Sequence, residues 1–311
     1  MNDQAKYLAR MAVLLVVLMG TIHIAWTAMI STAISYYYHA RIFDIHRIGH
    51  DDERTWMAAY IESTVSDDMV LAAGSSFTFL YPFDETYTFT SELNRRGIES
   101  INISATGYGS RDMHNAILCP LIKQGKRPRA IVLELSLINE VSSIRELENR
   151  AAVGDCPSIA SSGLFLFTLM HPLGKDWISI AKDQFRHVAP PDKPSLGVVP
   201  DSYFPTMAAF EKAKPILESN IKRLYARAKS ISENVSIFVT PVYFDGVTVV
   251  GRDADMVRLQ YEATLALCKR TAGLDCLDTS SLTNERYFAN VTHFNANGAR
   301  ALAEMIEARL R

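Results

Sequence analysis

An uncharged, largely apolar run from Met11 to Tyr38 constrains this chain more than any other feature of its sequence. The run contains no Asp, Glu, Lys or Arg, and His23 is its only ionisable side chain. About 20 apolar residues are enough to cross the hydrocarbon core of a bilayer. The sequence therefore predicts one transmembrane helix over residues 11–33.

The residues on either side of this run predict its orientation. Lys6 and Arg10 precede it, and the positive-inside rule keeps such a short basic N-terminus in the cytoplasm. Tyrosines at 36–38 suit the outer membrane–water interface, where aromatic side chains gather. We therefore expect residues 1–10 to be cytoplasmic and the long remainder of the chain to lie outside.

A cleaved signal peptide is the alternative to an anchor. The apolar run is longer than the core of a signal peptide, and no small-x-small cleavage site follows it promptly. An uncleaved signal-anchor is therefore favoured. It would lead into a juxtamembrane segment over residues 34–66 and an extracytoplasmic domain over residues 67–311.

Composition excludes several classes of function. The chain has 311 residues and a net charge of −2, without a basic stripe interleaved with aromatics, which argues against nucleic-acid binding. It has no P-loop and no GxGxxG motif, and no glycosidase-like carboxylate pair is recognisable. The spacing of His39, His46 and His50 matches no familiar metal-ligand set. We expect neither a metal nor a cofactor.

Strands and helices alternate through the domain, which predicts βαβ units and a mostly parallel sheet of about five strands. Strand-like apolar runs, some with the loop that follows, lie at residues 69–77, 99–109, 128–141, 235–246 and 274–282. Helix-like segments lie at residues 90–97, 110–125, 211–231, 254–273 and 294–311. Ser110 or Asp112 is the expected N-cap of the second of these helices. Residues 145–210 break the pattern and read as an insertion over the sheet.

Four cysteines suit an oxidising compartment. Cys268 and Cys276 flank a short turn and are expected to form a disulfide. Cys119 and Cys156 would form a second. Four buried thiols remain the alternative, because sequence does not fix connectivity.

Polar and small residues follow four successive elements of this pattern. Ligands of open parallel sheets bind at the carboxyl ends of the strands. There the sequence places Gly74-Ser75-Ser76, then Gly107, then Asn139-Glu140, and finally His293 before the last helix. A serine nucleophile, a histidine base and two oxyanion donors are the groups that acyl transfer needs.

The order and spacing of these residues resemble the SGNH (GDSL-like) hydrolase superfamily. VLAAGSSFTF resembles its first motif block, which implies Ser76 as the nucleophile and puts Ser75 where the family usually has Asp. NISATGYG resembles the second block and implies Gly107 as a backbone oxyanion donor. LINE resembles the third block, with Asn139 as a side-chain donor. NVTHFNANGA resembles the last, with His293 as the base.

This likeness spans roughly residues 68–310, apart from the insertion. It implies a three-layer α/β/α sandwich of flavodoxin-like topology. The GSS form of the first block is familiar in the membrane-anchored branch that D-alanylates teichoic acids. Accessory proteins of polysaccharide O-acetylation are similar.

Two positions depart from the family pattern. The residue three before His293 is usually an acid and here is Asn290, which can orient an imidazole through its oxygen but adds no charge. Asp278 and Glu285 are other acids nearby, without the expected spacing. Leu137 replaces the usual glycine of the third block.

Each of these residues also has an ordinary interpretation. Ser75 and Ser76 are good helix N-caps, Asn290 is a helix-start signal, and Gly107 permits a turn. His293 alone would be a satisfied loop histidine. Together, however, they fall in the family's order at the ends of successive strands.

The sequence and the resemblance imply a serine esterase or O-acyltransferase acting on a cell-envelope or exported polysaccharide. It would sit in the bacterial cytoplasmic membrane with its domain in the periplasm, beside a multi-pass membrane acyltransferase. A non-catalytic binding or scaffold subunit is the alternative, supported by Asn290 and Leu137. A lipase-like enzyme is a third hypothesis, motivated by the apolar segment at residues 162–170.

Overall fold

The computed structural model describes part of the chain. The described residues are 7, 10–22, 25, 57–58, 61–62, 64–79, 83–104, 107–140, 155–156, 189–194, 203–249 and 253–311. Most of the expected insertion, the apolar segment 162–170, residues 34–56 and the second half of the expected anchor lie outside them. Of the expected anchor, residues 11–22 are helical, in continuity with Arg10. Within the described residues, no helix combines the length and apolar character needed to cross a membrane.

All described residues from 57 onward belong to one α/β unit. Five parallel strands form its sheet in the order β2-β1-β3-β4-β5. The strands are β1 (Val70–Gly74), β2 (Ser100–Ser104), β3 (Ala130–Leu135), β4 (Asn234–Val239) and β5 (Cys276–Leu277). This is the flavodoxin-like order. The sequence-based expectation of a mostly parallel sheet of about five strands is confirmed.

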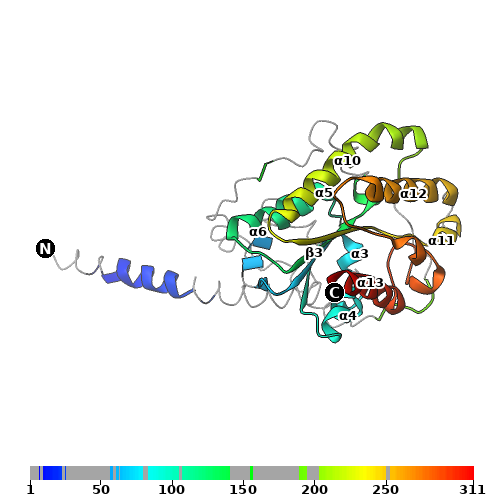
Figure 1. Ribbon diagram of the computed structural model, residues 1–311. Helices are drawn as coiled ribbons and strands as arrows, with labels where there is room; N and C mark the ends of the chain where they lie inside the picture. Colours follow the sequence, from blue (N-terminus) through cyan, green and yellow to red (C-terminus); the bar gives the residue numbers. More distant parts are fainter. Residues whose placement is uncertain are drawn as a thin grey trace. The chain divides into compact units, whose positions relative to one another are not determined.

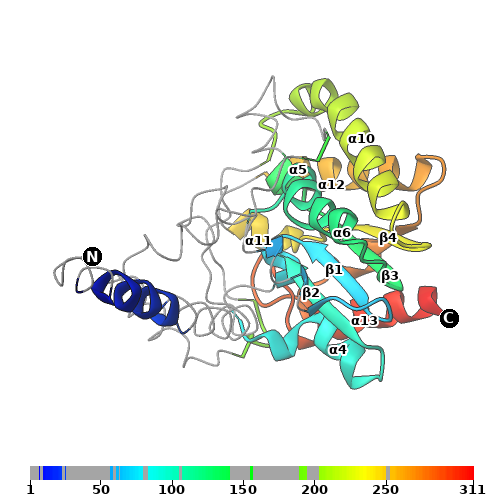
Figure 2. The ribbon, with the colours of Figure 1, turned by 90° about the vertical axis from the view of Figure 1, so that its left-hand side faces the viewer.

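Helices cover both faces of this sheet, as the two perpendicular views show (Figure 1, Figure 2). One face carries α4 (Phe89–Arg95) and α13 (Ala296–Leu310), which pack on each other. The other carries α5 (Ser110–Met113), α6 (Cys119–Gln124), α10 (Met207–Lys229) and α12 (Ala254–Arg270). Two short helices, α3 (Ser76–Phe79) and α11 (Phe244–Val249), also belong to this unit. Short 3-10 turns lie at Glu85–Tyr87, Thr279–Leu282 and Glu285–Tyr287.

The central strands are buried on both faces, which explains their almost continuous apolar sequences. Every residue of β1 and of β3 is buried. Val70 and Ala72 of β1 point into the core that α4 and α13 cover, together with Val132 of β3. Glu134 is the one ionisable residue in either strand, and its side chain is fully buried.

The structure corrects two boundaries and confirms a third. The third strand ends at Leu135, and residues 137–140 are helical, so the LINE segment is helical and not strand. The helix expected over 110–125 has Gly109 as its N-cap, in place of Ser110 or Asp112, and contains a π-helical turn at His114–Leu118. Its expected stop at Gly125 is correct, because Gly125 adopts a left-handed φ of 67° that favours glycine.

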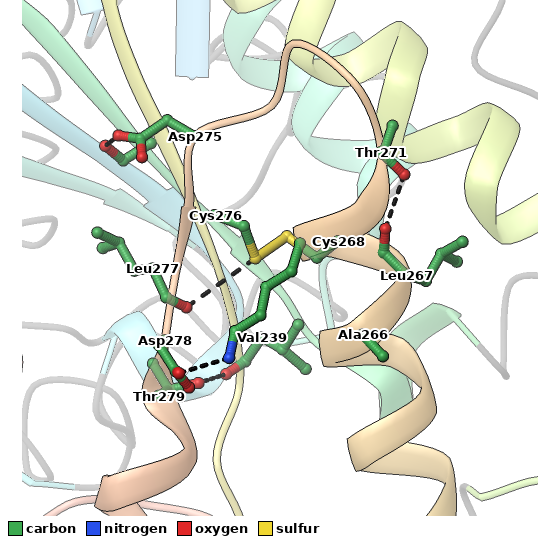
Figure 3. The surroundings of a disulfide bond; sticks show 12 residues. Val239, Ala266, Leu267, Cys268, Thr271, Asp275, Cys276, Leu277, Asp278 and Thr279 are labelled. Carbon is green, nitrogen blue, oxygen red and sulfur yellow. Dashed lines mark hydrogen bonds and ion pairs between the residues drawn. A yellow bond between two sulfur atoms is a disulfide. The ribbon is translucent and has the colours of Figure 1, made fainter.

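Both expected disulfides are present, and no cysteine is free. Cys119 in α6 bonds Cys156, 37 residues further along the chain. Cys268 in α12 bonds Cys276 at the start of β5, across a separation of 8 residues, so the shortest strand is tied to the helix that precedes it (Figure 3). The alternative of four buried thiols is wrong.

The two disulfides should differ in their contribution to stability. A cross-link stabilises mainly by restricting the unfolded chain, so the longer loop should contribute more. We expect Cys119→Ser/Cys156→Ser to lower the free energy of unfolding by roughly 3–4 kcal/mol, and Cys268→Ser/Cys276→Ser by roughly 2–3 kcal/mol. Urea denaturation of the two double variants measures both values. A larger loss from the shorter loop would contradict this account.

Candidate active site

The candidate site lies where the strand order reverses. β1 has β2 on one side and β3 on the other, and the crevice at such a reversal is where open parallel sheets bind ligands. The residues that follow the carboxyl ends of β1, β2 and β3 lie at this edge of the sheet.

The two serines after β1 have different surroundings. Ser75 is 1% exposed, and its hydroxyl donates to Glu134 Oε1 at 2.5 Å. Its N–H donates to Glu134 Oε2 at 2.7 Å. Ser76 is the first residue of α3 and is partly exposed. Ser76 is therefore the more exposed of the two serines, while Ser75, expected to bind substrate or the oxyanion, is buried against Glu134.

Glu134 holds this turn from the neighbouring strand. Besides the two bonds from Ser75, its carboxylate accepts from Thr78 N at 3.1 Å and from Thr240 Oγ1 at 2.8 Å. Sequence reasoning missed this residue as functional. The available signal was a single carboxylate inside an otherwise apolar strand, since such a group is rarely buried without a set of donors.

Asn290 fixes both the position and the tautomer of the candidate base. Asn290 Oδ1 accepts from Thr292 N at 2.9 Å and from His293 N at 2.8 Å. A backbone N–H only donates, so these bonds establish which atom of the amide is the oxygen. The same oxygen lies 3.0 Å from His293 Nδ1, which must therefore carry the proton. The neutral imidazole then has its lone pair on Nε2, as a general base requires.

An aromatic contact brings the serine turn and the histidine loop together. Phe77, the residue after Ser76, packs edge-on against Phe294, the residue after His293, with ring centroids 4.6 Å apart. Both rings are buried. Ser76 and His293 are thus each one residue away from a single packing contact.

The second and third motif positions also meet. Gly107 has a φ of 84°, a conformation that side chains disfavour, which explains the glycine. The Asn139 amide donates from Nδ2 to the carbonyl of Tyr108 at 3.1 Å. An amide NH₂ has two N–H groups, so this bond ties Asn139 to the Gly107 turn with one and leaves the other as a candidate donor.

Glu140 is hydrogen-bonded to the backbone just after the Gly107 turn. It is 1% exposed, and its Oε1 accepts from Ser110 N, at the start of α5, at 2.5 Å. Burial is the main cause that raises the pKa of the Glu140 carboxyl, partly opposed by hydrogen bonds from Ser110. Sequence analysis noted Glu140 only as a polar neighbour of Asn139.

Asp278, one of the two other acids considered from sequence, has contacts elsewhere. Asp278 caps the 3-10 turn Thr279–Leu282 by accepting from Ser280 N at 3.1 Å, and it pairs with Lys269. The hydrogen bond from Lys269 is the largest cause that lowers the pKa of Asp278. The start of the last helix is likewise assigned differently, because Asn295 and not Asn290 is the N-cap of α13.

Within the described residues, one group has the side chains of a metal site. His114, Cys119 and Cys156 place their ligand atoms within 4.8 Å of one another. Both sulfurs are joined in a disulfide, so the group offers only an imidazole. Burial lowers the pKa of His114 and favours its neutral form.

Comparison with known proteins gives a likeness of fold only. The sequence matches no protein-family model and no curated protein. Among solved structures, a G-D-S-L family protein from Desulfitobacterium hafniense DCB-2 aligns over 78% of this chain and 99% of its own, at 13% identity and a TM-score of 0.43. A lipase from a goat rumen metagenome aligns over 78% and 96%, at 12% identity and a TM-score of 0.44. A catalytic mutant of an acetylxylan esterase from Geobacillus stearothermophilus aligns over 79% and 94%, at 16% identity and a TM-score of 0.43.

Replacing Glu140 by Gln should make the free energy of unfolding depend less on pH. The amide oxygen can still accept from Ser110 N, while the ionisable group is removed. Because the folded-state pKa of Glu140 is raised above 4.5, the stability that this carboxyl contributes is complete below that value and is lost as pH rises through the folded pKa. We expect Glu140→Gln to gain on the order of 1–3 kcal/mol over wild type between about pH 4 and about pH 8. Denaturant titrations at both pH values measure this gain, and a difference that does not change with pH would contradict the assignment.

Proposed function

We propose that this chain is a membrane-anchored, extracytoplasmic serine esterase or O-acyltransferase that acts on cell-envelope or exported polysaccharide. The contact between Phe77 and Phe294 carries the proposal, because it joins the Ser76 turn to the His293 loop. The hydrogen bonds to Asn290 also support it, because a proton on Nδ1 leaves His293 Nε2 as the atom that accepts a proton.

In the first half-reaction Ser76 Oγ attacks the carbonyl carbon of an acyl ester. His293 Nε2 takes the hydroxyl proton as the new C–O bond forms. The tetrahedral oxyanion is held by the N–H of Gly107 and the second N–H of Asn139, which the Tyr108 carbonyl orients. When the intermediate collapses, the leaving alkoxide takes the proton from His293 and Ser76 keeps the acyl group.

The second half-reaction returns the enzyme to its starting state. An acceptor hydroxyl gives its proton to His293 and attacks the acyl-serine. Ser76 leaves as an alkoxide and regains the proton from His293. Water as the acceptor makes the chain an esterase, and a sugar hydroxyl makes it an O-acyltransferase.

The uncharged run from Met11 to Tyr38 supports the anchored location. An anchor of this kind would hold the domain beside the polymer as it leaves the membrane. We further propose that a multi-pass membrane acyltransferase delivers the acyl group to this site. The resemblance of the GSS motif to the membrane-anchored branch of the SGNH superfamily motivates this partner.

A serine-directed fluorophosphonate should label Ser76 of the full chain in detergent. Ser76→Ala removes the nucleophile and His293→Ala removes the base, so both should label at least about 10³-fold more slowly than wild type. Mass spectrometry of the digested protein locates the adduct. Ser75→Ala is the matched control for position, and an adduct on Ser75 would contradict the proposal.

Absence of any adduct from folded wild-type protein would favour the alternative, a non-catalytic subunit that binds polymer or partner. The neutral Asn290 is the observation behind this alternative, because an amide does not stabilise the imidazolium that catalysis forms.

Changing Asn290 to Asp should raise the rate of labelling. An aspartate oxygen can accept the same two N–H groups and adds a negative charge next to Nδ1, which stabilises the imidazolium. An acid-to-amide change costs about 10⁴ in a Ser-His-Asp enzyme, so we expect a gain of about tenfold or more. Asn290→Ala should lose about tenfold or more for want of the orienting oxygen. Thr292→Val removes a hydroxyl that lies 3.2 Å from the same Nδ1, so it measures how much that hydroxyl adds to the orientation of the ring. Equal rates for the Asp and Ala variants would contradict this role for Asn290.

A further inference from the structure

Glu134 is a buried carboxylate with an unusual set of partners. It is 0% exposed, and four donors converge on its two oxygens. Two of the donors are backbone N–H groups, from Ser75 and Thr78, on either side of Ser76. Among the described residues, no ion pair with a basic side chain involves Glu134. Donors that belong mainly to the serine turn therefore compensate its charge.

Gly74 makes this approach possible. A Cβ atom at position 74 would overlap Glu134 Oε2 and would lie 2.5 Å from Thr78 Oγ1. Both approaches are too close for real atoms, so any side chain there would displace the carboxylate or the turn. The glycine of the GSS motif thus leaves the space that the Glu134 carboxylate, on the neighbouring strand, occupies.

We propose that Glu134 is the positioning residue of the Ser76 turn. Its carboxylate, reaching across from β3, fixes the backbone on both sides of Ser76 so that Ser76 Oγ is presented toward the His293 loop. This inference rests on the proposed function, because it assigns Glu134 a part in the same serine site. Glu134 does not contact substrate and acts through the turn alone.

The division of donors between the two oxygens determines what a variant must keep. Glu134 Oε2 accepts only from N–H groups, so an acceptor is indispensable there. Oε1 accepts from the hydroxyls of Ser75 and Thr240, and a hydroxyl can turn to accept instead. Glutamine, with its oxygen in place of Oε2 and its NH₂ facing the hydroxyls, therefore satisfies the whole set. Alanine satisfies none of it.

Replacing Glu134 tests this directly in the full chain. We expect Glu134→Ala to lower the rate of fluorophosphonate labelling at Ser76 by roughly 10²-fold, the loss typical of a displaced reacting group. Glu134→Gln should stay within about threefold of wild type, since both N–H groups keep an acceptor and both hydroxyls keep a hydrogen bond to residue 134. Thr240→Val is the matched control, because it removes a bond to Oε1 without touching the turn, and it should also stay within about threefold.

Thermal unfolding of the same variants separates positioning from general destabilisation. If Thr240→Val and Glu134→Ala lose labelling in proportion to their loss of melting temperature, the proposal is overturned. Labelling of Glu134→Ala at the wild-type rate, or equal losses in Glu134→Gln and Glu134→Ala, would also overturn it.

A change at Ser75 provides a rescue that a purely structural role does not predict. Ser75→Asp places a second carboxylate against Glu134, so this variant alone should label slowly. Because position 75 directly precedes α3, the introduced carboxylate could accept from Phe77 N or Thr78 N in the manner of an N-cap. Ser75→Asp/Glu134→Ala should therefore label about tenfold or more faster than either single variant. A double variant as slow as the slower single variant would refute the assigned acceptor role.

Amide hydrogen exchange keeps this test separate from the test of catalysis. If wild type takes no label, the proposed function fails, but hydrogen exchange still measures how well the Ser76 turn is ordered. Glu134→Ala should lose protection at the amides of Ser75 and Thr78 while the amides of β1 and β3 stay protected, and Glu134→Gln should retain protection at both. Unchanged protection at both amides in Glu134→Ala would overturn the positioning role regardless of activity.

Discussion

The candidate site depends on a carboxylate that is buried in the middle of the sheet. Burying a charge is unfavourable unless donors replace the lost water, and here the donors come from the chain segment that must be ordered. The free energy that would otherwise oppose folding thus favours one conformation of the β1–α3 turn. The family that the sequence resembles usually has an acid in the turn itself. In this chain Ser75 stands at that position and is hydrogen-bonded to Glu134 of β3.

A second level of order comes from aromatic packing. Phe294 contacts Phe77 on one side and Phe288 on the other, with centroids 4.6 Å and 5.3 Å apart. The histidine loop is thereby fixed both to the serine turn and to the segment that leads into it, and Asn295 closes it by accepting from Asn297 N and Gly298 N. Non-directional burial brings the loop into place, and the directional hydrogen bonds that Asn290 Oδ1 accepts then set the ring of His293.

The fold could be predicted well from sequence, because strands buried on both faces and amphipathic helices have distinct patterns. The end of β3 could not, since the apolar pattern of 128–141 continues past Leu135. Glu140, which accepts from Ser110 N, belongs to the helical segment that follows. Of the site, the Asn290–His293 pairing was foreseeable from a spacing of three residues. The role of Glu134 was not, because it joins residues 59 and 56 positions away, and no local pattern marks such contacts. The meeting of Phe77 and Phe294 is equally non-local.

The last strand has a further consequence. β5 is only two residues long, and the Cys268–Cys276 bond ties it to α12 (Figure 3). A sheet edge is open to strand addition in proportion to its free N–H and C=O groups. An edge of this length offers almost no template for pairing with another molecule. The shortness of β5 thus protects this side of the protein against aggregation through its sheet.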